Sequence, residues 1–156
     1  MPLSAIKAMK SIADEFFALT PEQRRTVHFA LCEHALQKWH QDVSAQTRIE
    51  YTESVVGTHQ IVDQQLPVDA LESAKRSVDV GQVGKRYREP IAALHDDDLV
   101  FPQNITFAYY ALYNLFKKYG QGESVDDWLI VNQAISSEKD EQAWEVLLTK
   151  AIRTIV

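Results

Sequence analysis

The sequence of 156 residues contains few of the residues that would indicate an oxidising compartment or an irregular chain. Cys32 is its one cysteine, so no disulfide can form within the chain. Five glycines and five prolines are too few for a fibrous or low-complexity protein. Apolar residues make up 46% and charged residues 24%, which is typical of a globular protein, and the length predicts one domain over residues 1–156.

Long apolar runs and a secretory leader are also missing. Apolar runs such as residues 128–131 are far shorter than the roughly 20 residues that cross a bilayer as a helix. The first ten residues lack the basic stretch, apolar stretch and small-residue cleavage site of a secretory signal. We therefore expect a cytoplasmic protein that does not enter the membrane.

The net charge of −6 is concentrated in the later part of the chain. Residues 96–156 contain ten acidic and five basic side chains, a net charge of −5. Such a surface repels a phosphate backbone and attracts a basic protein. We expect a protein partner and no nucleic-acid partner.

The spacing of apolar residues predicts an all-α protein, a single-domain antiparallel bundle or array of seven to eight helices. Apolar residues recur at helical spacing over most of the chain, and no segment keeps the strict alternation of a half-buried strand. The helices are predicted over residues 3–19, 21–41, 44–65, 67–79, 90–95 and 104–119, with two more that begin after Ser124 and Ser137.

Capping patterns support several of these boundaries. Residues 20–23, Thr-Pro-Glu-Gln, combine an N-cap hydroxyl, a proline at the first helical position and a Gln that can complete a capping box. Residues 124–127 and 137–140 each begin with Ser and end with Asp, which predicts two further capping boxes.

The helix over residues 104–119 is apolar on most of its circumference, so we expect it at the centre of the bundle. Trp39, Trp128 and Trp144 each lie in the middle of an apolar helix face. All three are predicted to belong to the core.

His28 and Cys32 are separated by one helical turn, a spacing that can offer two ligands to one metal ion. A third ligand is missing nearby. We therefore expect His28 to be a core histidine that is hydrogen-bonded to a neighbouring helix, and Cys32 to be a packing residue.

An enzymatic alternative comes from the order of His59, His95, Asp96 and Asp126. This order resembles the metal ligands of the HD family of metal-dependent phosphohydrolases, which are also all-helical. The resemblance covers these four residues and implies that they converge on a metal ion that activates water. It is the alternative to a non-catalytic function.

Other catalytic patterns are weaker or missing. Glu50 and Glu53 lie three residues apart and would share one face of a helix, as in helical nucleotide pyrophosphatases that hold Mg²⁺ with longer sets of such pairs. A second pair is missing at helical spacing, so a solvated face is the simpler interpretation. The sequence has no Gly-rich phosphate loop, nucleophile elbow or zinc-finger spacing, and we expect no cofactor.

The sequence therefore favours a non-catalytic protein-binding domain. Its most specific form is an immunity or antitoxin protein that binds a basic toxin and covers its active site. If the toxin is a nuclease, its phosphate-binding site is basic and attracts an acidic surface. The predicted partner-binding residues are Asp96, Asp97, Asp98, Asp126 and Asp127, with Tyr110 as an aromatic anchor. Two alternatives stay open: Asp126 and Asp127 can serve a helix N-terminus, and Tyr110 can form a second packing layer.

Overall fold

A computed structural model of the chain describes residues 3–42, 48–52, 57, 59–63, 65–76, 103–138 and 140–155. The elements in these ranges are α1 (Leu3–Phe17), α2 (Pro21–Asp42), β1 (Arg48–Thr52), β2 (His59–Asp63), α3 (Leu66–Arg76), α5 (Gln103–Tyr119), α6 (Asp127–Ser136) and α7 (Glu141–Arg153).

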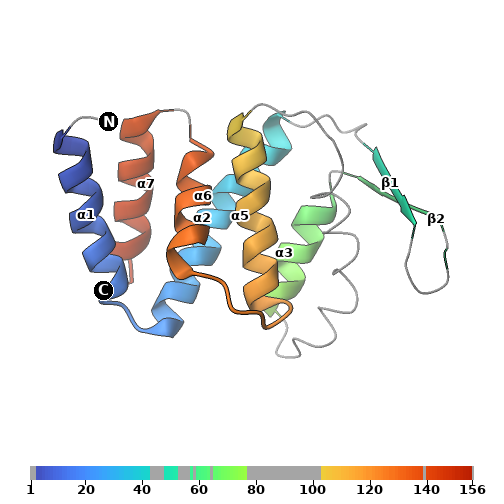
Figure 1. Cartoon of the computed structure of the whole chain (residues 1–156), viewed down its shortest axis with the longest axis horizontal. Coiled ribbons are helices and arrows are strands. Elements are labelled where there is room, and N and C mark those ends of the chain that lie inside the picture. The colour runs from blue at the N-terminus through green and yellow to red at the C-terminus, as the bar shows by residue number, and fades with distance from the viewer. Residues whose placement is uncertain are drawn as a thin grey trace.

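These helices form a bundle in which α1, α7, α6, α5 and α3 follow one another across Figure 1, with α2 behind α6 and α5. The prediction of a helical bundle is thus confirmed for the body of the molecule. Six helices lie in the described ranges, against the seven to eight expected, and the helix predicted over residues 90–95 lies outside those ranges.

The prediction of a helix over residues 44–65 is wrong, because this segment contains a β-hairpin. Strands β1 and β2 pair antiparallel, from Arg48 opposite Asp63 to Thr52 opposite His59. Strand β1 contains Ile49, Tyr51 and Thr52, and β2 contains Ile61 and Val62, all of residue types that favour a pleated backbone. Gly57, between the strands, has a φ of +79°, which a helix does not tolerate and L side chains rarely adopt. The hairpin lies at the far end of the bundle, beyond α3 (Figure 1).

The capping box at the start of α2 is confirmed. The Thr20 N–H donates to Gln23 Oε1 at 2.9 Å, and the Gln23 N–H donates to Thr20 Oγ1 at 3.2 Å. Each side chain therefore satisfies a backbone donor that the first helical turn leaves without a partner.

The other two predicted capping boxes are wrong. Helix α6 begins at Asp127, so its N-cap is Asp126, whose Oδ1 accepts from the N–H groups of Trp128 and Leu129 at 2.8 and 3.3 Å. Ser137 is the C-cap of α6, with its hydroxyl donating to the Ala134 carbonyl at 2.6 Å. At the start of α6, Asp126 caps the helix in place of Ser124, because its carboxylate also interacts favourably with the helix dipole.

The core lies where α2 and α5 cross the bundle. Helix α5 packs against α2, α3 and α6, as its all-round apolarity predicts, and α2 shares the centre by packing against α3, α5, α6 and α7. Trp39 and Trp144 are buried, as predicted. Trp128, also predicted as a core residue, is only partly buried and packs against the core from its edge.

Gly120, which follows α5, is required by a close approach to Phe116. A Cβ atom at Gly120 would lie 2.7 Å from two atoms of the Phe116 ring and 2.8 Å from its carbonyl oxygen. Because that contact is shorter than packed atoms tolerate, we expect Gly120→Ala to destabilise the protein by about 1 to 3 kcal/mol in urea denaturation. Ser124→Ala, at an exposed position in the same connection, is the control, and equal midpoints for the two variants would contradict the prediction.

Candidate functional site

A partly buried polar network joins α2, α5 and α6 at the end of the bundle where α1 stops and α2 begins. His28 of α2 is fully buried and lies at its centre. Its Nδ1 lies 2.7 Å from the Tyr119 hydroxyl, and its Nε2 lies 2.8 Å from the Asp127 carbonyl oxygen. A carbonyl only accepts, so Nε2 carries the proton and Nδ1 accepts from Tyr119. The prediction of a core histidine bonded to neighbouring helices is confirmed.

The Asp127 carboxylate ties the same three helices together. It pairs with Arg24 Nη1 of α2 at 3.3 Å and with Lys118 Nζ of α5 at 2.9 Å. Burial acts to raise the pKa of Asp127, but its bonds to Lys118 and Arg24 outweigh burial and hold the pKa below its ordinary value. Asp127 is therefore an anion with two cationic partners.

Burial also sets the protonation of the two groups that meet at Nδ1. It lowers the pKa of His28 and raises the pKa of Tyr119, so the imidazole is neutral and the phenol keeps its proton at neutral pH. Both ring nitrogens of His28 are occupied by these bonds. His28 therefore holds helices together and offers no open ring nitrogen for proton transfer or metal binding.

Cys32 is buried one turn further along α2, and its thiol lies 3.7 Å from the Ala111 carbonyl oxygen. Burial raises the pKa of this thiol, which keeps it in the unreactive protonated form. Cys32 packs in the core, as predicted.

A second polar cluster joins α2 to the residues that follow α6. Glu138 contacts His34 Nε2 and pairs with Lys38 Nζ at 3.2 Å. Burial acts to raise the pKa of Glu138, but its bonds to His34 and Lys38 outweigh burial, so the pKa is lowered. These contacts join two segments of the fold, so this cluster also holds the structure together.

The predicted partner-binding residues differ in where they lie. Asp126 is exposed and caps α6, whereas Asp127 is partly buried and belongs to the network around His28. Tyr110 is partly buried against the core, with its ring 6.5 Å from that of Phe107. Asp96, Asp97 and Asp98 lie outside the described residues.

Of the four residues of the HD-like alternative, His59 and Asp126 lie in the described parts of the chain, and they are on different sides of the bundle (Figure 1). His59 begins β2, which Figure 1 places on the far side of α3 and α5 from α6, where Asp126 is the N-cap. His95 and Asp96 lie outside the described residues. Glu50 belongs to β1, so the prediction that it shares a helix face with Glu53 is wrong, and Glu53 itself is not among the described residues.

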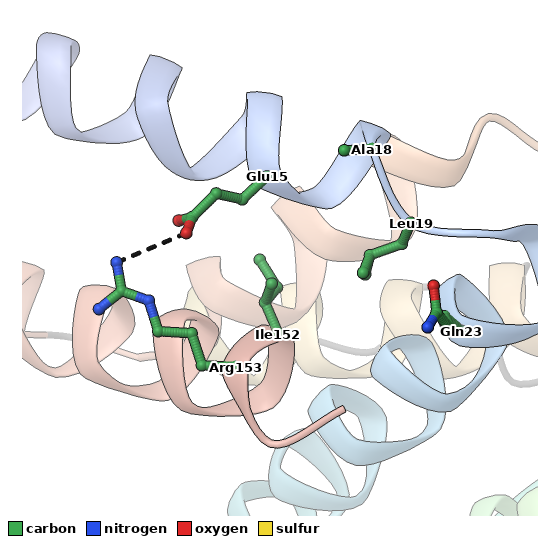
Figure 2. A pocket seen from close by; sticks show the side chains of 6 residues that line it. All are labelled: Glu15, Ala18, Leu19, Gln23, Ile152 and Arg153. Carbon is green, nitrogen blue, oxygen red and sulfur yellow. Dashed lines mark ion pairs between the residues drawn. The ribbon is translucent and has the colours of Figure 1, made fainter. Parts of the chain in front are cut away.

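A shallow pocket of about 570 Å³ opens between the end of α1, the start of α2 and the end of α7 (Figure 2). Leu19 and Ile152 supply apolar walls, and Glu15 pairs with Arg153 at 3.6 Å across one side. Ala18 and Gln23 complete the lining. The Gln23 Oε1 is already used by the capping box. No sequence motif pointed to this pocket, because its residues come from two segments that are far apart in the sequence, residues 15–23 and 152–153.

No family model, curated protein or solved structure matches this chain. Among the described residues, no three His, Cys, Asp or Glu side chains are grouped so that they could hold a metal ion. The helices in the same ranges are all too short or too polar to span a bilayer.

Proposed function

We propose that this chain is a non-catalytic protein-binding domain that captures a basic protein through acidic residues of its later half. The observation that supports this function is the net charge of −5 in residues 96–156. Three of the five cations in that segment are engaged in ion pairs within the molecule: Lys117 with Glu123, Lys118 with Asp127, and Arg153 with Glu15. Glu123, Asp127 and Glu138 are used in ion pairs inside the molecule, so the attraction of an approaching cation falls to the other acids of the segment.

The titratable groups with shifted pKa values are consistent with this interpretation. His28, Asp127 and Glu138 each bond side chains or backbone of other segments, so burial and charge are used to hold helices together. In a catalytic site such groups face a cleft that admits substrate. A binding protein instead acts through its exposed surface.

The most specific form of the proposal is an immunity or antitoxin protein. Such a protein must cover the active site of a toxin, and a toxin that cleaves nucleic acid carries a basic site for phosphate. An acidic surface speeds the encounter with that site and rejects partners of like charge. Asp96, Asp97 and Asp98 are the proposed centre of this attraction, with Asp126 at the start of α6 as a further exposed acid.

The first test identifies the partner and compares two charge-matched variants. The purified chain is immobilised, its partner is captured from an extract of the native cell, and the partner is purified for binding measurements. We expect a basic protein, and we expect Asp96→Asn, Asp97→Asn and Asp98→Asn together to slow its association several-fold.

The control variant removes the same charge from α2 and α3 through Glu33→Gln, Asp69→Asn and Glu72→Gln. Two of these acids form exposed ion pairs, with Lys75 and Arg76, that contribute little to stability. Equal association rates for the two triple variants would contradict the role of the Asp triplet. Thermal stabilisation of the chain by Mn²⁺ would instead favour the metal-dependent phosphohydrolase.

A further inference from the structure

Exposed apolar side chains gather where the end of α1 meets the start of α6. The large apolar side chains exposed in the described ranges are Phe17 at 49%, Leu129 at 40% and Val146 at 68%. Phe17 is the last residue of α1, and its ring centroid lies 5.9 Å from that of Trp128, in the first turn of α6. Leu129 follows in the same turn. We call Phe17, Trp128 and Leu129 the α1–α6 patch.

The patch is held in place by polar contacts at its base. Arg24 donates to the Phe17 carbonyl at 2.6 Å, lies 5.6 Å from the Phe17 ring centroid and pairs with Asp127 at the start of α6. The N–H groups of Trp128 and Leu129 are bound by Asp126. Because both helix ends are already fixed in the free chain, ordering them on binding would cost little conformational entropy.

The charges around the patch favour a cationic partner. Asp126 is exposed beside Trp128 and Leu129, and Asp14 is exposed one helical turn before Phe17, on the same face of α1. Arg24, which lies over the Phe17 ring, is paired with Asp127, as is Lys118. An apolar centre with a charged rim is the usual arrangement of a protein interface.

We propose that the α1–α6 patch is the docking surface for the basic partner, which inserts a large apolar side chain flanked by Lys or Arg. This inference rests on the proposed function and adds the place and chemistry of contact. Phe17 and Leu129 contact the partner's apolar side chain, and Asp14 and Asp126 contact its cations.

The test combines crosslinking with binding measurements. A photo-crosslinking residue at position 129 of the full chain, expressed in its native cell, is expected to give an adduct with a basic protein, whereas the same residue at position 146 gives none. With that protein purified, Phe17→Ala and Leu129→Ala are each expected to weaken binding tenfold or more, and Val146→Ala to leave it unchanged. Asp126→Asn removes the charge and keeps an N-cap, so slower association without a loss of melting temperature is expected, with Glu145→Gln as the control.

The outcomes separate the two proposals. A basic partner that is captured and binds Phe17→Ala and Leu129→Ala with wild-type affinity would overturn the docking surface and leave the proposed function standing. Failure to find a basic protein by either capture or crosslinking would overturn both.

Discussion

Replacing Trp39 with alanine is expected to lower the free energy of unfolding by about 3 to 5 kcal/mol, enough to unfold much of a domain of ordinary stability. Trp39 is 1% exposed, and its ring centroid lies 5.4 Å from that of Tyr109 at the junction of α2 and α5. The loss combines the transfer free energy of the indole with the cavity that it leaves.

Urea denaturation followed by circular dichroism measures this effect without relying on the deleted fluorophore. Phe17→Ala is the matched control, because it truncates an aromatic side chain that is half exposed at the end of α1. We expect the control to cost about 1 kcal/mol or less. A Trp39→Ala midpoint as high as that of the control would show that the α2–α5 junction does not hold the fold.

Acidification below about pH 6.5 is expected to destabilise the protein through His28. Burial lowers the pKa of His28 in the folded state from its ordinary 6.5, so the unfolded chain takes up a proton at a pH where the folded chain does not. The contribution of His28 is therefore complete above pH 6.5 and decreases as the pH falls toward the folded-state pKa. The free energy of unfolding can fall by at most about 1.4 kcal/mol per pH unit from this single group.

Urea midpoints measured from about pH 5 to pH 8 test this slope. His28→Phe should remove it, and should also cost about 1 to 3 kcal/mol for the Tyr119 hydroxyl, which loses its partner. His40→Gln, at an exposed position on the same helix, should keep the slope. Asp127 and Glu138 have lowered pKa values, so their contributions are lost only at more acidic pH. A slope unchanged by His28→Phe would assign the pH dependence to other groups.

Features set by neighbours in the sequence could be predicted from the sequence. The α2 capping box depends on residues three apart, and the central position of α5 follows from its own apolarity. The burial of Trp39 and the bonding of His28 to another helix follow from an apolar helix face and from the cost of burying an unbonded imidazole. These predictions needed no knowledge of which segments meet.

Features set by long-range pairing could not be predicted. Tyr119 and Asp127 lie 91 and 99 residues from His28, and one sequence does not indicate which distant polar groups meet. The hairpin was missed because short apolar stretches, such as those within residues 44–65, fit helical and extended periods alike. The β-branched residues around Gly57 were the available signal. Phe17 and Trp128 lie on different helices, so the contact between their rings was not visible in the sequence either.

Attraction of a basic partner by the acidic half of the chain is tested most directly by the salt dependence of association. The association rate of the purified chain with its captured partner is measured from about 0.1 M to about 1 M salt, over which the Debye length falls from about 10 Å to about 3 Å. Long-range attraction predicts a steep fall in the association rate, a smaller change in the dissociation rate, and a flatter dependence for the triple Asn variant at positions 96–98. An association rate that is independent of salt, and equal for the wild-type chain and that variant, would contradict electrostatic capture of the partner.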